Sequence, residues 1–144
     1  MNELLLMCAI AGRRAAIPAL KVQSVIEIET LTTIPRTPDF ICGLTALRSQ
    51  ALTVVDCRVS LGFSASETVI GGRAAVVEHE GHRYALLVDE AYDVAEALGA
   101  ARQVPGGFGA GWQRAARGMV ETETGPALLV DVEALLLGPE RAAA

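Results

Sequence analysis

The sequence predicts a mainly β protein that is built as two small antiparallel barrels with short capping helices. Three observations favour this class. Short apolar runs are separated by hairpin bends, and this pattern occurs twice along the chain at a repeat of about 70 residues. Apolar residues make up 51% of the 144 residues, enough for a packed core without disulfides. Barrels are favoured over open sheets because they hide strand edges.

The first third of the chain reads as a hairpin, a short helical turn and a third strand. An apolar run at residues 4–11 and a second run at 15–18 flank a Gly-Arg-Arg bend. Proline is tolerated in a first helical turn, so we expect a short helical segment at residues 19–23. Residues 25–29 alternate as a half-buried strand does, with Ile26 and Ile28 facing inward. Two prolines within residues 34–39 then require a loop.

The stretch from residue 40 to 62 predicts a hairpin that leads into a capped helical turn. An apolar run at 40–44 and a β-rich run at 52–55 flank a polar bend at 48–50. The carboxylate of Asp56 can then accept hydrogen bonds from the free N–H groups of a short turn, which Gly62 ends.

The second half of the chain repeats these elements after a polar connector. Runs at residues 73–78 and 82–88 predict a hairpin that turns at 79–81. Near the end, Asp131 should cap a short helix over 132–137, which Gly138 and the following proline end.

An internal repeat supports two lobes. Gly12 corresponds to Gly81, Gly43 to Gly118 and Asp56 to Asp131, with the later pairs spaced slightly further apart than the first. We therefore expect lobe 1 at about residues 12–70, lobe 2 at about 72–138, and extra loop in lobe 2 within 99–112. The whole chain, residues 1–144, is then a single domain of two lobes that share a groove.

Composition excludes several classes of function. The net charge is −5, and the basic residues are dispersed arginines except for Lys21, so neither a nucleic-acid surface nor a polybasic membrane anchor is expected. Lys21 follows no glycine loop, which excludes a Walker-type phosphate site. Three distant cysteines indicate reduced structural thiols in a cytoplasmic protein. The N-terminal apolar run is too short for a membrane span and lacks the pattern of a signal peptide.

No residue set predicts catalysis, a cofactor or a metal. His79 and His82 fall one residue short of the H-E-x-x-H spacing and lie at an expected hairpin tip, where a solvated turn explains them. The glycine-rich segment 105–112 fits a mobile loop better than a phosphate cradle. Within it, Phe108 and Trp112 either fold back onto the core, which we favour, or present an adhesive surface.

Arg48 is the charged residue that the sequence singles out. At a hairpin bend its guanidinium could make forked hydrogen bonds to the carboxylates or backbone carbonyls of a partner. Alternatively it braces its own loop through Asp39 or Glu27.

The central stretch resembles the CheW-like adaptor domains of bacterial chemotaxis. The residues that carry the resemblance are Phe40, Ile41, Gly43, Leu44, Leu47, Arg48, Val54, Val55, Asp56, Arg58, Leu61 and Gly62. Blocks at residues 17–23 and 85–90 support it, and it extends over about 4–137. The resemblance implies two five-stranded SH3-like barrels side by side, with the N-terminal strand at 3–11 crossing into lobe 2.

The resemblance also implies a function. It identifies a non-enzymatic cytoplasmic adaptor, without cofactor, that couples the cytoplasmic tips of chemoreceptors to the regulatory domain of a CheA-type histidine kinase. The groove between the barrels would take a receptor tip, and a face around Gly43 would contact the kinase. The residues implied to line the receptor groove are Val22, Arg48, Val88 and Val94.

The chain departs from the family pattern at Ser24, Ala46 and Ser49, where an acidic residue, asparagine and glycine are usual. These departures motivate a second hypothesis, in which the protein is a divergent scaffold of a non-flagellar signalling cluster, such as one that serves pili or biofilm. A small-molecule-binding double barrel is a third hypothesis, and it requires convergent polar groups in the cleft between the lobes.

Overall fold

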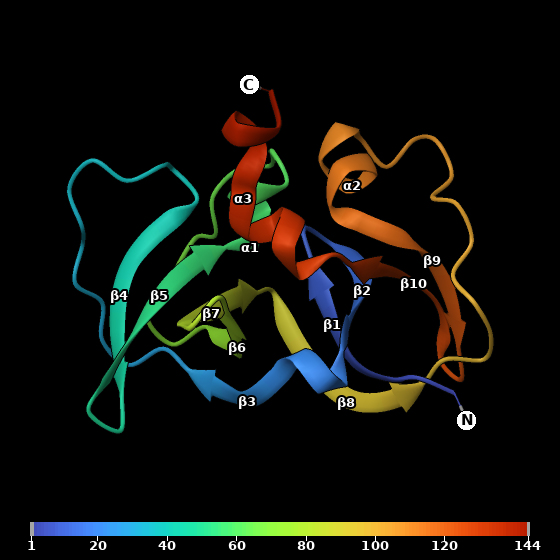
Figure 1. Ribbon diagram of the computed structural model, residues 1–144, viewed down its shortest axis with the longest axis horizontal. Coiled ribbons are helices and arrows are strands. Elements are labelled where there is room, and N and C mark those ends of the chain that lie inside the picture. Colours follow the sequence, from blue (N-terminus) through green and yellow to red (C-terminus); the bar gives the residue numbers. More distant parts are fainter. Residues whose placement is uncertain (1, 144) are drawn as a thin grey trace.

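Two five-stranded β-sheets form the molecule in a computed structural model that describes residues 2–143 (Figure 1). Sheet A has the strand order β8 (Glu90–Glu96), β1 (Leu4–Ile10), β2 (Arg13–Pro18), β10 (Gly125–Val130) and β9 (Ala116–Thr122). Sheet B has the order β3 (Val22–Glu27), β6 (Arg73–His79), β7 (His82–Val88), β5 (Gln50–Asp56) and β4 (Ile41–Leu47). The prediction of a mainly β fold with five strands in each half is confirmed.

Strand pairing is antiparallel except for one parallel pair in each sheet, β2 with β10 and β5 with β7. Isolated bridges bring the edges of each sheet together: Thr32, beyond β3, pairs with Leu44 of β4, and Ala97, beyond β8, pairs with Thr122 of β9. Over the described residues no continuous ladder joins the edge strands of either sheet, so the closed barrel stays a prediction.

The sheets divide the chain differently from the predicted lobes. β2 falls within predicted lobe 1 but lies in sheet A with β8, β9 and β10, as β1 does. β6 and β7 fall within predicted lobe 2 but lie in sheet B with β3, β4 and β5. Each half of the chain thus gives its first hairpin to the sheet of the other half. A sequence repeat identifies equivalent segments, but it does not specify which copy they pair with.

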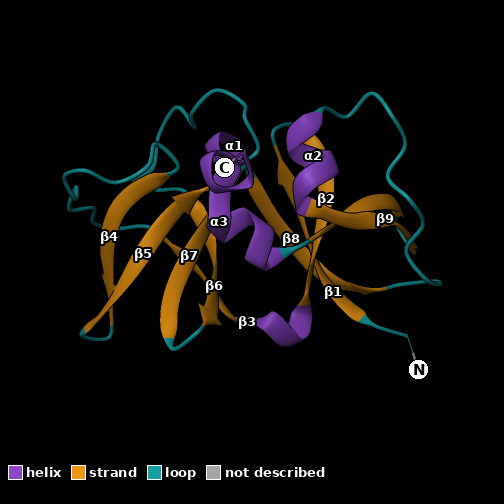
Figure 2. Cartoon of the chain, turned by 45° about the horizontal axis from the view of Figure 1, so that its top comes forward, coloured by secondary structure: helices purple, strands orange, loops and turns teal. Residues whose placement is uncertain are grey.

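Three α-helices lie at one end of the molecule, between the sheets, and a short helical turn lies at the other end beside β3 (Figure 2). They are α1 (Cys57–Ser60), α2 (Ala110–Ala115) and α3 (Val132–Ala143), and a 3-10 turn, η1 (Ala19–Lys21), precedes β3. Both predicted caps are confirmed: Asp56 accepts from the backbone N–H of Arg58 at 3.0 Å, and Asp131 accepts from that of Ala134 at 3.2 Å. Gly138, with φ of 74°, interrupts α3 where the sequence predicts its end.

Arg114 joins the three helices. Its guanidinium, carried by α2, donates to the carbonyl oxygens of Ser60 in α1 and Ala134 in α3. The hydroxyl of Ser60 also donates to the carbonyl of Leu135 at 2.6 Å. These bonds satisfy carbonyl groups that a short helix leaves free at its end, so they stabilise the helical end of the molecule.

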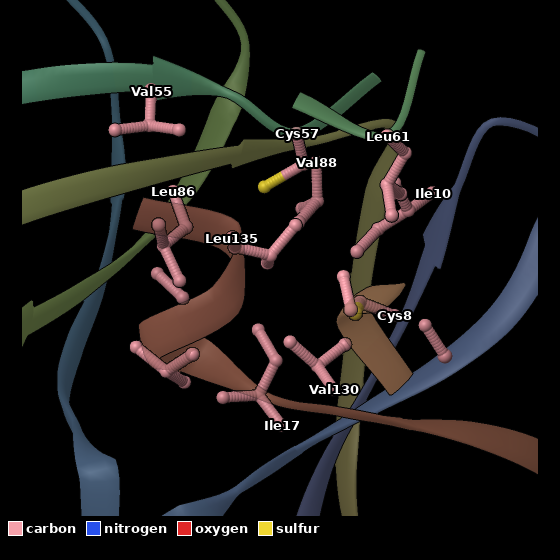
Figure 3. Packing of buried hydrophobic residues seen from close by; sticks show 14 of the residues in the cluster. Cys8, Ile10, Ile17, Val55, Cys57, Leu61, Leu86, Val88, Val130 and Leu135 are labelled. Carbon is pink, nitrogen blue, oxygen red and sulfur yellow. The ribbon is translucent and has the colours of Figure 1, made fainter. Parts of the chain in front are cut away.

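Three apolar cores result from this arrangement. One lies on a face of sheet A and includes Leu5 and Leu129, and one lies on a face of sheet B and includes Leu52 and Leu87. The largest, here named the central core, combines side chains from the opposite faces of both sheets with others from the helices (Figure 3). Its members include Cys8, Ile17, Val55, Cys57, Leu86, Val88, Trp112, Val130 and Leu135. The two halves are therefore packed through a shared interior.

All three cysteines are free. Burial, reinforced by the charge of Asp89, raises the pKa of Cys8 from 9.0 to about 12. Burial likewise raises the pKa of Cys42 to about 11 and that of Cys57 well above its ordinary value. The thiols of Cys8 and Cys57 pack in the central core as small apolar groups.

Candidate functional site

Arg48 lies at the tip of the hairpin between β4 and β5. Leu47 pairs with Gln50, which leaves Arg48 and Ser49 as a two-residue loop with φ of 51° and 67°. Positive φ at both central residues is typical of a type I′ turn, which matches the twist of the flanking strands. The family's usual glycine is replaced by Ser49 here, and Ser49 adopts the positive φ that this turn requires.

The side chain of Arg48 is exposed, and it makes no ion pair or hydrogen bond with residues 2–139, whose side chains the structure describes. The bracing contact through Glu27 does not form. Glu27 instead lies 4.0 Å from the guanidinium of Arg73. A guanidinium held at a turn and without an internal partner is available to a carboxylate or carbonyl of another protein.

The four residues implied to line a receptor groove lie on different elements. Val22 begins β3 and is half-buried, while Val94 lies on β8 with 54% of its surface exposed. Val88 ends β7, is only 5% exposed and packs in the central core, so little of its side chain is open to a partner. The reason is that β7 is a central strand of sheet B and has α1 beside it. Val88 borders a hollow that Arg58 and Asp89 also line, and Val94 borders another beside Tyr92, so these two valines do not line one groove.

Gly43 has a steric reason to be glycine. A Cβ atom there would lie 2.3 Å from the carbonyl oxygen of Thr32. That oxygen accepts from the backbone N–H of Leu44, and the N–H of Thr32 donates to the carbonyl of Leu44, both at 2.8 Å. A Cβ atom at Gly118, its counterpart in the repeat, would likewise lie 2.4 Å from the carbonyl oxygen of Arg102. In both halves glycine admits a second backbone beside an edge strand.

The structure adds apolar residues that the sequence did not single out. Leu20 on η1, Val25 on β3 and Tyr92 on β8 are exposed, and β3 and β8 run along the lower margin of Figure 1. Leu20 could have been found, because it stands between Pro18 and Lys21 in a turn too short to bury a side chain. The hydroxyl of Tyr92 donates to Glu90 at 2.6 Å, which raises the pKa of Tyr92.

The histidines and the aromatic residues that the sequence analysis considered lie at a hairpin tip and in or beside the central core. His79 and His82 are opposite each other at the end of the β6–β7 hairpin, as predicted. Trp112 is fully buried, and Phe108 packs at the margin of the central core with the guanidinium of Arg13 4.9 Å from its ring centre. Over the described residues, no group of three or more His, Cys, Asp and Glu side chains is placed to hold a metal ion. No helix among them has the length and apolar character to cross a membrane.

Comparison with known proteins gives a family from the sequence and a matching fold from the structure. The CheW-like domain family matches residues 4–140. The chain is 27% identical over 93 residues to the chemotaxis protein CheW of Bacillus subtilis (strain 168), an alignment that spans 65% of this chain and 60% of that protein. It thus matches less than two thirds of that relative's length.

The crystal structure of the scaffolding protein TtCheW from Thermoanaerobacter tengcongensis has the same fold, with a TM-score of 0.77 and 22% identity. The superposition covers 90% of this chain and 89% of that one. With the family match over almost the entire sequence, this chain belongs to the family of CheW-like domains.

Proposed function

We propose that this protein is a non-enzymatic adaptor that couples chemoreceptors to a CheA-type histidine kinase in the cytoplasm. The observation that carries the proposal is its membership of the CheW-like family over residues 4–140. Such an adaptor acts by shape, apolar contact and a few polar anchors. Apolar contact of modest affinity suffices when many copies act together, because multivalency raises the effective affinity.

On the receptor side, the proposed contacts are Arg48, Val22 and Val94. The exposed side chain of Val94 can meet the apolar face of a receptor helix, and Arg48 can bind a carboxylate or a free carbonyl on the same partner. Val88, which is buried, would support this surface from beneath through the central core.

On the kinase side, the proposed contact is the edge of sheet B around Gly43. Its contribution would come from backbone shape, since Gly43 has no side chain and lets the segment around Thr32 approach β4 closely. Substitution at Gly43 would therefore change the surface through the fold, and kinase binding by such variants is interpretable only alongside their stability.

Calorimetric titration with a receptor tip fragment tests the receptor side. Val94→Glu buries a charge in the proposed contact and should abolish binding, whereas Arg48→Ala should weaken it about tenfold. Ile70→Glu is the matched control, because Ile70 is also an exposed aliphatic residue but lies outside the proposed surface. Unchanged receptor binding by folded Val94→Glu and Arg48→Ala would overturn this assignment.

A partner outside flagellar chemotaxis is the second candidate. The three departures from the family pattern, at Ser24, Ala46 and Ser49, are all exposed, so they change the surface and leave the cores intact. Titration against receptor tips from each signalling cluster of the host separates the two candidates. Selective binding to a tip from a pilus or biofilm cluster would favour the second.

A further inference from the structure

A hollow of about 650 Å³ lies between α3, the start of β4 and the tip of the β6–β7 hairpin. We name it the α3 groove. Its lining includes Phe40, Ile41, His79, Glu80, Glu133 and Leu137. It contains none of the residues proposed above for the receptor, and at Ile41 it adjoins the edge of sheet B proposed for the kinase.

The floor of the α3 groove is apolar and well supported. Phe40 is buried, and the chain turns at Gly138 directly against its ring, where a Cβ atom would lie 2.1 Å from the nearest ring carbon. Leu136 is half-buried beside this floor, and Leu137 keeps 42% of its surface exposed. An apolar side chain that entered the groove would remove these surfaces from water.

The charged residues of the groove are acidic. Glu80, at the hairpin tip, has 83% of its side chain exposed and lies 3.9 Å from Nε2 of His79, and Glu133 lies in the first turn of α3. Among residues 2–139, whose side chains the structure describes, no lysine or arginine lines the groove. An adjoining hollow, which shares His79 and Glu133, also contains Lys21, Arg117, Glu78 and Asp131, so its acidic residues outnumber its basic ones by one.

We infer that the α3 groove binds a protein segment in which an aliphatic side chain is flanked by lysine or arginine. The aliphatic group would occupy the floor between Phe40 and Leu137, and the cations would lie against Glu80 and Glu133. Charge complementarity selects a basic partner over an acidic one, because a like-charged segment would be repelled at both carboxylates. The inference is independent of the receptor and kinase contacts proposed above.

The test uses a fluorescent amphipathic peptide with leucines on one helical face and lysines beside them, and an otherwise identical peptide with glutamate in place of lysine. Fluorescence anisotropy measures binding to the full chain. We expect saturable binding of the lysine peptide, and about tenfold weaker binding after E80Q/E133Q or after Leu137→Ser. Leu98→Ser and Glu90→Gln are matched controls on exposed positions outside the groove, and both should leave the affinity unchanged.

Amide chemical shifts of the labelled protein locate the peptide independently of these variants. Shifts confined to the groove residues, together with the loss in both groove variants, support the inference. It is overturned by absence of saturable binding, by equal binding of the glutamate peptide, by equal weakening in the controls, or by shifts that map elsewhere. Circular dichroism checks that each variant remains folded.

Discussion

Gly43 and Gly118 show how a single residue type positions a backbone in both halves of the protein. Each has positive φ and lies against a carbonyl oxygen that a Cβ atom would overlap, at 2.3 and 2.4 Å. Neither can be relieved by a side-chain rotation, because the obstructing atom belongs to the backbone. The bridging segments at Thr32 and Arg102 would have to move away.

We therefore expect Gly43→Ala and Gly118→Ala each to lower the free energy of unfolding by about 3 kcal/mol. Gly81→Ala is the control, since Gly81 also has positive φ but has open space around it; it should cost about 1 kcal/mol. Urea denaturation measures all three. Equal losses would show that backbone conformation, and not close approach, requires glycine at 43 and 118.

Ser49 gives a prediction of the opposite sign. Its φ of 67° is uncommon for a residue with a side chain, and glycine adopts it without strain. Ser49→Gly should raise the free energy of unfolding by up to about 1 kcal/mol, since relief of strain exceeds the added entropy of the unfolded chain. A lower urea midpoint in this variant would contradict the turn geometry described here.

At the scale of elements, helices α1 and α3 differ in the burial of the aspartate that caps them. Asp56 is 2% exposed and accepts from the backbone N–H of Arg58 and from both the N–H and the hydroxyl of Ser66. Asp131 is half-buried and accepts from the N–H of Ala134. The buried cap therefore holds a loop as well as a helix end.

Asp56→Ala should lower the free energy of unfolding by about 3 kcal/mol, because it leaves three part-buried donors on Arg58 and Ser66 without this partner. Asp131→Ala should cost about 1 kcal/mol, a typical value for an N-cap. Thermal or urea unfolding measures both, and similar losses would contradict the difference in burial.

These elements also show what the sequence could predict. The hairpins, both caps and the break at Gly138 follow from local patterns, because apolar runs, capping carboxylates and glycine act over a few residues. The exchange of hairpins between the halves does not follow from local patterns. It depends on the parallel pairing of β2 with β10 and of β7 with β5, strands that are distant in sequence. The burial of Val88 was missed for the same reason: it depends on which sheet β7 joins.

At the scale of the whole molecule, the central core joins both sheets and contains two thiols, Cys8 and Cys57. The pKa of Cys8 rises from 9.0 to about 12 on folding, so the folded state keeps a proton that the unfolded state loses above pH 9. Stability is thus fully present below pH 9 and falls as pH rises toward 12. Each such thiol contributes a slope of about 1.4 kcal/mol per pH unit in that range.

Urea denaturation between pH 8 and 11 measures this slope. The Cys8→Ala variant serves as the comparison, because the other groups that titrate in this range are unchanged in it. We expect the variant to lose stability less steeply than the parent protein. Parallel slopes would show that Cys8 does not remain buried and protonated as the structure places it.

The proposed receptor contacts and the proposed kinase edge around Gly43 are different sets of residues, and an adaptor requires both contacts at once. The direct test is sedimentation velocity of the protein mixed with a receptor tip fragment and the regulatory domain of the CheA-type kinase from the same organism. We predict a ternary complex that sediments faster than either pair, and its loss on Val94→Glu with retention of the kinase pair. If the two partners exclude each other, or if the folded protein binds neither, the account of this protein as a coupling adaptor is contradicted.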